Sequence, residues 1–100
     1  MEMLASEDTP IERDQLLERV LSLHPKVALR PEPFGALAYH FDNRRLVFLK
    51  HPDVVTVVGA LRPPMTVREV LTECGIHPRR WPSFQTALTS LLESEMLHEH

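Results

Sequence analysis

The sequence predicts a mixed α+β fold in which two or three antiparallel strands are followed by helices. Between Val27 and Leu49 the side chains alternate with a period of two, which is typical of strands. After Leu49 the apolar residues recur at helical spacing, between segments bounded by proline, glycine and capping residues.

A hairpin forms the centre of the predicted sheet. Gly35 to Phe41 reads as one strand and Arg44 to Leu49 as its partner, with Asp42 and Asn43 between them. These two residue types tolerate the positive φ that a tight turn demands. In the first strand we expect Leu37, Tyr39 and Phe41 on one face and Ala36, Ala38 and His40 on the other. In the return strand we expect Leu46 and Phe48 on one face and Val47 and Leu49 on the other, so that both of its faces are apolar.

A third strand is predicted ahead of the hairpin. Val27 and Leu29 alternate there with Ala28 and Arg30, before a Pro31-Glu32-Pro33 corner. Proline cannot donate a ladder hydrogen bond, so this corner should lie at a sheet edge or in a loop. This corner could be a rigid element that sets the hairpin or a surface that docks an enzyme.

The N-terminal part predicts a flexible segment, residues 1–9, ahead of a single domain over residues 10–100. Thr9, Pro10 and Glu12 fit a helix start with a capping box. We expect this helix to end near His24-Pro25, although its residues could instead be recruited as a strand. Its apolar face would comprise Ile11, Leu16, Leu17, Val20 and Leu21.

Three further helices are predicted after the hairpin. Pro52 and Asp53 favour a short helix, with a strand as the alternative because the run is β-branched. A second capping box at Thr66 and a glycine at Gly75 bound a helix from Val67 to Cys74. The last helix begins at Pro82, just after Trp81. The helix from Val67, the turn with Gly75 and this last helix together resemble a helix-turn-helix. The apolar residues of the last helix are Phe84, Leu88, Leu91 and Leu92.

Charge is unevenly distributed along the 100 residues. The net charge is -3, but residues 19–80 carry ten bases and five acids, while both ends are acidic. The basic middle could attract an acidic peptide or a nucleic acid, or it could be an ordinary solvated surface. The start of the chain lacks a secretory signal pattern and Cys74 is the single cysteine, so we expect a cytoplasmic protein.

Residue patterns for catalysis are nearly absent, and we expect neither an enzyme nor a cofactor. The sequence has no phosphate loop, nucleophile motif or cysteine pair at metal spacing. His98 and His100 are interpreted as a dangling tail, and Cys74 as a structural thiol near a helix C-terminus. Binding is therefore the function to look for.

The strand from Arg45 to Leu49 is the candidate binding element. It is apolar on both faces, and at a sheet edge it would present unpaired N–H and C=O groups to an added peptide strand. Coverage of both faces as core by the last helix is the alternative. Arg44 and Arg45 could pair with acidic peptide residues or only keep the turn soluble.

The run LHPKVALRPEPFGALAYHFDNRRLVFLKHPDVVTVV, Leu23 to Val58, resembles the peptide chaperones of mycofactocin biosynthesis. These belong to the PqqD-like family, also called RiPP recognition elements. The resemblance implies a winged-helix-like fold, with a three-stranded antiparallel sheet followed by three helices. It also implies a non-catalytic peptide chaperone, which binds a ribosomally made precursor peptide by strand addition and presents it to a radical SAM maturase.

Carried onto this chain, the resemblance places the peptide between a strand and the last helix. The strand side is Arg45, Leu46, Val47, Phe48 and Leu49. Helical geometry selects Trp81, Gln85, Leu88, Thr89 and Leu92 for the other side. The expected partners are the precursor peptide and the maturase, with no nucleic acid and no membrane. A winged-helix nucleic-acid-binding protein and an oligomerisation module are the alternatives, although the last helix carries no Lys or Arg.

Overall fold

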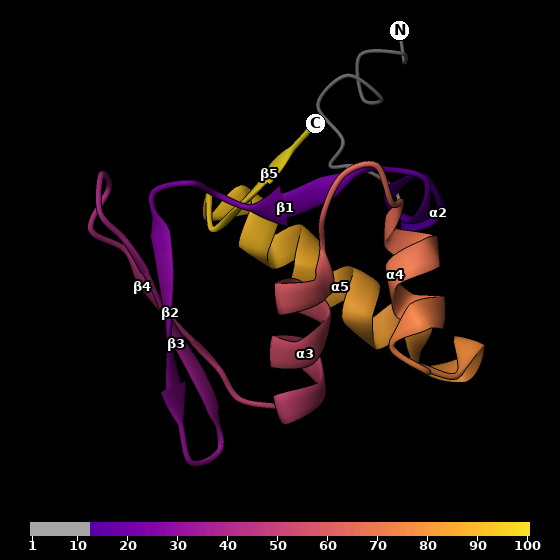
Figure 1. Cartoon of the computed structure of the whole chain (residues 1–100), viewed down its shortest axis with the longest axis horizontal. Coiled ribbons are helices and arrows are strands. Elements are labelled where there is room, and N and C mark those ends of the chain that lie inside the picture. Colours follow the sequence, from indigo (N-terminus) through magenta and orange to yellow (C-terminus); the bar gives the residue numbers. More distant parts are fainter. Residues whose placement is uncertain (1–12) are drawn as a thin grey trace, which may run out of the picture.

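The computed structural model describes residues 13–100, and it places a three-stranded antiparallel sheet on one side of a group of helices (Figure 1). The predicted mixed α+β fold, with three strands followed by three helices, is confirmed. The strands are β2 (Val27–Glu32), β3 (Gly35–His40) and β4 (Leu46–Leu49). The helices after them are α3 (Pro52–Ala60), α4 (Val67–Glu73) and α5 (Trp81–Glu93), with a 3-10 turn at Pro78–Arg80.

The sheet turns its small residues inward. Ala36, Ala38 and His40 of β3 are buried, whereas Leu37 and Tyr39 between them are only half-buried. The two alanines leave room for α3, which packs against β3 and β4. The alternation predicted for the hairpin is therefore confirmed, and the face with the larger side chains is the outer one.

β2 is an edge strand, and this explains the position of Pro31. Phe41 N–H donates to the Lys26 carbonyl (2.8 Å), and bonded pairs alternate with unbonded ones along an antiparallel ladder. Counting from this pair, the Pro31 nitrogen faces away from β3, where no donor is needed. The expectation that the proline corner lies at a sheet edge is confirmed.

The hairpin turn differs in detail from the prediction. The left-handed residue is Arg44 (φ 62°), rather than Asp42 or Asn43. Arg44 N–H donates to the His40 carbonyl (2.9 Å), and Asn43 Oδ1 accepts from Arg45 N–H (2.8 Å). The turn is thus longer than a two-residue turn and needs a single left-handed position near its end.

The predicted helix ending near His24-Pro25 is wrong in its second half. Helix α2 (Arg13–Leu17) stops at Leu17, and β1 (Leu21–Leu23) follows it. β1 pairs antiparallel with β5 (Leu97–Glu99), which supplies the backbone partners that a helix would have supplied internally. The capping box Thr9–Glu12 and the flexible segment 1–9 lie outside the described residues.

The C-terminal histidines are part of this second sheet, so their interpretation as a dangling tail is wrong. His98 lies in β5 opposite Ser22, and His100 N–H donates to the Val20 carbonyl (2.8 Å). An ion pair of Arg19 Nη1 with Glu99 Oε1 (2.6 Å) also connects the segment before β1 to β5. The termini of the described chain are thus joined across the top of α5 (Figure 1).

Capping fixes the ends of α4 as the sequence predicts. Thr66 Oγ1 accepts from Glu69 N–H (3.2 Å), and Glu69 Oε1 accepts from Thr66 N–H (2.9 Å). Gly75 takes φ 75° at the other end, where Ile76 N–H donates to the Leu71 carbonyl (3.0 Å). With the bond from Gly75 N–H to the Thr72 carbonyl (3.0 Å), it forms a glycine C-terminal cap.

The core lies between the helices and the inner face of the sheet. Its fully buried side chains are Leu16, Leu21, Val57, Val58, Val67, Val70, Leu71, Leu88, Met96 and Leu97. α3 and α5 bury the faces that their apolar spacing predicts. None of the helices in residues 13–100 is long and apolar enough to cross a membrane.

Candidate functional site

The open edge of β4 is the first component of the candidate site. In the strand order β2-β3-β4, β4 is hydrogen-bonded on one side only. His40 N–H donates to the Arg45 carbonyl (3.0 Å). Because hydrogen-bonded pairs alternate along the ladder, the backbone N–H and C=O groups of Val47 and Leu49 point toward β3. The N–H and C=O groups of Leu46 and Phe48 point the other way, toward the open edge.

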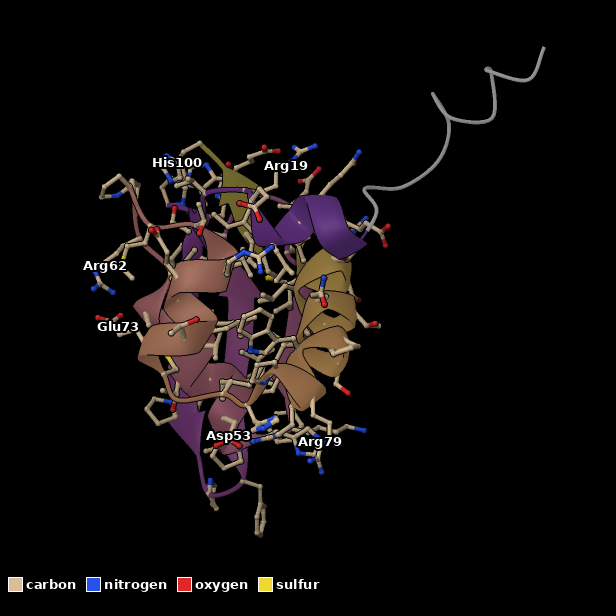
Figure 2. All side chains as sticks on the ribbon, turned by 90° about the vertical axis from the view of Figure 1, so that its right-hand side faces the viewer. Arg19, Asp53, Arg62, Glu73, Arg79 and His100 are labelled. Carbon is tan, nitrogen blue, oxygen red and sulfur yellow. The ribbon has the colours of Figure 1, made fainter. Side chains whose placement is uncertain are left out.

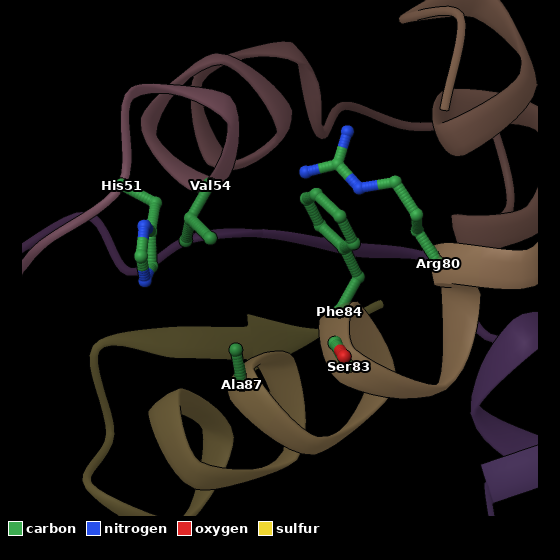
Figure 3. Close-up of a pocket in the computed structure, with 6 residues that line it drawn as sticks. All are labelled: His51, Val54, Arg80, Ser83, Phe84 and Ala87. Carbon is green, nitrogen blue, oxygen red and sulfur yellow. The ribbon is translucent and has the colours of Figure 1, made fainter. Parts of the chain in front are cut away.

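A groove lies between β4, the start of α3 and α5, and we call it the β4–α5 groove. It consists of two adjoining hollows that share His51, Val54 and Ala87. The hollow beside β4 has a volume of about 240 Å³ and is also lined by Val47, Phe48, Leu49, Lys50, Ser90 and Leu91. The hollow beyond the end of β4 has a volume of about 390 Å³ and is also lined by Arg80, Ser83 and Phe84 (Figure 3).

The groove wall on α5 is made by small residues. Ser83, Ala87 and Ser90 follow one another at steps of four and three residues, which places them on one helical face. Phe84 and Leu91 lie beside them and are buried. The result is a shallow, mostly apolar channel beside strand groups that can form hydrogen bonds.

The five predicted strand residues lie in or next to β4. Val47, Phe48 and Leu49 line the groove. The Leu46 side chain is exposed on the outer face of the sheet, and Arg45 is exposed just ahead of the strand. The structure therefore brings three of the five residues to the groove.

The five residues chosen on the last helix do not line the groove. Gln85 and Leu88 are buried, while Trp81, Thr89 and Leu92 are half-buried. The Trp81 indole donates to the Ile76 carbonyl (2.9 Å), and the Arg68 guanidinium of α4 lies 5.7 Å from the centre of its ring. These residues belong to the face of α5 that packs into the helical part of the molecule.

Helical geometry selected a face of α5 that serves the core, where Gln85 and Leu88 are buried. In the sequence, the small-residue series Ser83, Ala87, Ser90 was the available signal for the groove face. Small side chains on a helix allow another chain to approach closely. The three groove residues of β4 carried their own signal, a strand that is apolar on both faces.

The outer face of the sheet is apolar and uncovered in the described structure. Phe41, Leu46 and Phe48 expose 57%, 58% and 43% of their surface. Tyr39 packs edge-on against Phe41, with ring centres 5.3 Å apart. At roughly 200 Å² for a full side chain of this size, these three residues expose about 300 Å² of mainly apolar surface. We call Leu37, Tyr39, Phe41, Leu46 and Phe48 the outer patch.

Ionic groups gather at the far end of the groove. Arg80 Nη2 lies 2.9 Å from Asp53 Oδ2, and the Arg80 guanidinium lies 5.3 Å from the centre of the Phe84 ring. Lys50 lines the neighbouring hollow. The groove is thus mainly apolar, with the Lys50 cation in the hollow beside β4 and the Arg80 cation in the hollow beyond its end.

The described residues offer little for catalysis. No group of three or more His, Cys, Asp or Glu side chains in residues 13–100 is placed to hold a metal ion. Burial raises the pKa of the Cys74 thiol, and the nearby Glu73 carboxylate raises it further, while Arg62 acts in the opposite direction. A thiol with a raised pKa stays protonated at neutral pH, so it is a poor nucleophile.

Comparison with known proteins supports the resemblance read from the sequence. The Peptide chaperone MftB family matches residues 20–98. A protein of Mycolicibacterium smegmatis named Peptide chaperone MftB is 45% identical over 75% of this chain and 74% of its own length. Proteins of the same name from Mycobacterium ulcerans and Mycobacterium tuberculosis are each 41% identical over 80% of this chain and 73% of their length. No solved structure gave a significant match. The chain belongs to the Peptide chaperone MftB family.

Proposed function

We propose that this chain binds the precursor peptide of mycofactocin by strand addition to β4 and presents it to a radical SAM maturase. Its family is named for peptide chaperones, in agreement with the expectation that it is not an enzyme. The observation that carries the proposal is the open edge of β4 beside the β4–α5 groove. An extended peptide can satisfy the edge groups and place alternate side chains in the groove.

Side chains must supply most of the affinity. The edge-facing groups of Leu46 and Phe48 offer about four hydrogen bonds, each worth ~1 kcal/mol net. Ordering about five peptide residues costs a similar or larger amount, at ~1 to 2 kcal/mol each. Burial of ~400 Å² of apolar surface would add ~10 kcal/mol before association costs, at ~25 cal/mol per Å². Micromolar or somewhat tighter binding is then expected.

The outer patch supports a second partner. A peptide paired to β4 would turn every other side chain outward, next to Leu46 and Phe48. The maturase could therefore contact the outer patch and the peptide together. With about 300 Å² from its three most exposed residues, the patch suits a transient contact better than a permanent dimer, which needs roughly 800 Å² per partner. Replacement of Phe41 by serine should then weaken maturase binding and leave peptide affinity within twofold.

The nucleic-acid alternative is less favoured by the sequence of α5. Residues 81–93 contain no Lys or Arg, whereas a recognition helix normally uses them for phosphates and bases. The basic residues next to α5 in the sequence are Arg79 and Arg80, and they lie in the preceding 3-10 turn.

Calorimetric titration with the precursor peptide encoded beside the gene tests the proposal, with a DNA duplex of unrelated sequence as the control. Saturable binding of one peptide per chain, near or below micromolar, is expected. Salt-sensitive binding of the duplex with no heat from the peptide would refute the proposal in favour of nucleic acid.

A further inference from the structure

The hollow beyond the end of β4 has a chemistry of its own. Its floor is apolar, from Val54, Phe84 and Ala87, while its rim carries Arg80, His51 and Ser83. Figure 3 shows the His51 and Val54 side chains directed across the hollow toward α5, with the Arg80 side chain extended beside Phe84. β4 ends at Leu49, so a peptide leaving the paired segment would pass over this hollow.

From this arrangement, and resting on the proposed function, we infer that the hollow is a subsite for a carboxylate side chain of the peptide. The substrate class is thus a peptide with an Asp or Glu immediately beside its strand-forming apolar segment.

Arg80 is the group that would bind the carboxylate. Its Nη2 is paired with Asp53, but a guanidinium carries five N–H donors, so it can serve a second carboxylate at the same time. The Phe84 ring and the Asp53 pair both hold the guanidinium at the rim. An arginine held in place loses less side-chain freedom on binding than a free one.

The local charge balance favours an acidic ligand. Arg80 lines this hollow, Lys50 lines the adjoining one, and Arg79 precedes Arg80 in the same 3-10 turn, while Asp53 is the acid paired with Arg80. A neutral peptide laid over the hollow would remove water from Arg80 without replacing it, which costs free energy. A carboxylate compensates for that loss by a charge-assisted hydrogen bond.

Arg62 provides a matched control for Arg80. Both are half-exposed arginines, with 52% and 53% of their side chains exposed, and both are paired with one carboxylate. Arg62 pairs with Glu73 (3.1 Å) on a different flank of the molecule from Asp53 (Figure 2). It does not line either hollow.

The test compares Arg80→Gln and Arg62→Gln in calorimetric titrations with the precursor peptide at low salt. A second copy of the peptide, with every Asp and Glu replaced by Asn or Gln, is titrated in parallel. We expect Arg80→Gln to weaken binding about tenfold and Arg62→Gln by less than twofold. The Arg80→Gln effect should vanish with the neutral peptide, since the two changes remove the same interaction.

Two outcomes would overturn the inference, and they are distinguishable. If the precursor binds but Arg80→Gln and Arg62→Gln behave alike, or if the Arg80→Gln effect persists with the neutral peptide, the carboxylate subsite is refuted and the peptide groove stands. If the precursor does not bind the unaltered protein, the proposed function fails and the inference fails with it.

Discussion

Proline substitution at two adjacent residues of β4 should separate peptide binding from folding. The Phe48 N–H faces the open edge, whereas the Val47 N–H faces β3, opposite Ala38. Proline is tolerated in an edge strand where the lost N–H faces outward. Phe48→Pro should therefore fold, and Val47→Pro should disrupt the ladder between β3 and β4.

The expected loss of affinity follows from one missing donor. The lost hydrogen bond is worth ~1 kcal/mol net, and the peptide carbonyl left without a partner costs a further ~1 to 2 kcal/mol. At 1.4 kcal/mol for each factor of ten, Phe48→Pro should weaken peptide binding by about 30- to 150-fold.

The assay is calorimetric titration with the precursor peptide, together with thermal unfolding of each variant. Phe48→Ala is the matched control, because it removes the same ring and keeps the N–H. It should lose clearly less affinity than Phe48→Pro. A folded Phe48→Pro protein that binds as tightly as Phe48→Ala would refute strand addition at this edge.

Three other predictions concern stability. A Cβ added at Gly35 would lie 1.7 Å from the Leu49 carbonyl oxygen, so Gly35→Ala should lower the free energy of unfolding by ~2 kcal/mol, measured by denaturant titration. Thr66→Ala should lower it by ~1 kcal/mol through loss of the cap, while Thr66→Ser should retain it. Burial lowers the pKa of His98, with contributions from His100 and His24. On acidification the His98 imidazole therefore binds its proton at a higher pH in the unfolded chain than in the folded one, which favours unfolding. Lowering the pH from about 7 to about 5 should thus lower Tm less in His98→Gln than in the unaltered protein.

The sheet and the three later helices were predictable because each has a local signal. Alternation marks β3, Pro52 marks the start of α3, and Thr66 with Gly75 marks both ends of α4. These features act between neighbouring residues, so they can be read without knowing the fold.

The β1–β5 pair had no such signal. Its strands have three residues each and lie more than seventy residues apart in the sequence. The turn that leads into β5 uses Glu95 in the left-handed conformation (φ 66°), with Met96 N–H donating to the Leu91 carbonyl (2.9 Å). This cap is normally marked by glycine, so the end of α5 and the strand after it went unrecognised.

The groove was only half predictable for a related reason. β4 is apolar on both faces, which reveals that it meets two environments. α5 carries a strong apolar stripe for the core and a weaker series of small residues for the groove, and only the fold shows which face lies opposite β4.

Amide hydrogen exchange along β4 tests the central claim most directly. In the free protein, the Leu46 and Phe48 amides face the open edge and should exchange quickly, while Val47 and Leu49 are protected by β3. Addition of the precursor peptide should slow exchange at Leu46 and Phe48 and leave Val47 and Leu49 nearly unchanged. Saturation with peptide and no added protection at Phe48 would show that the peptide binds elsewhere.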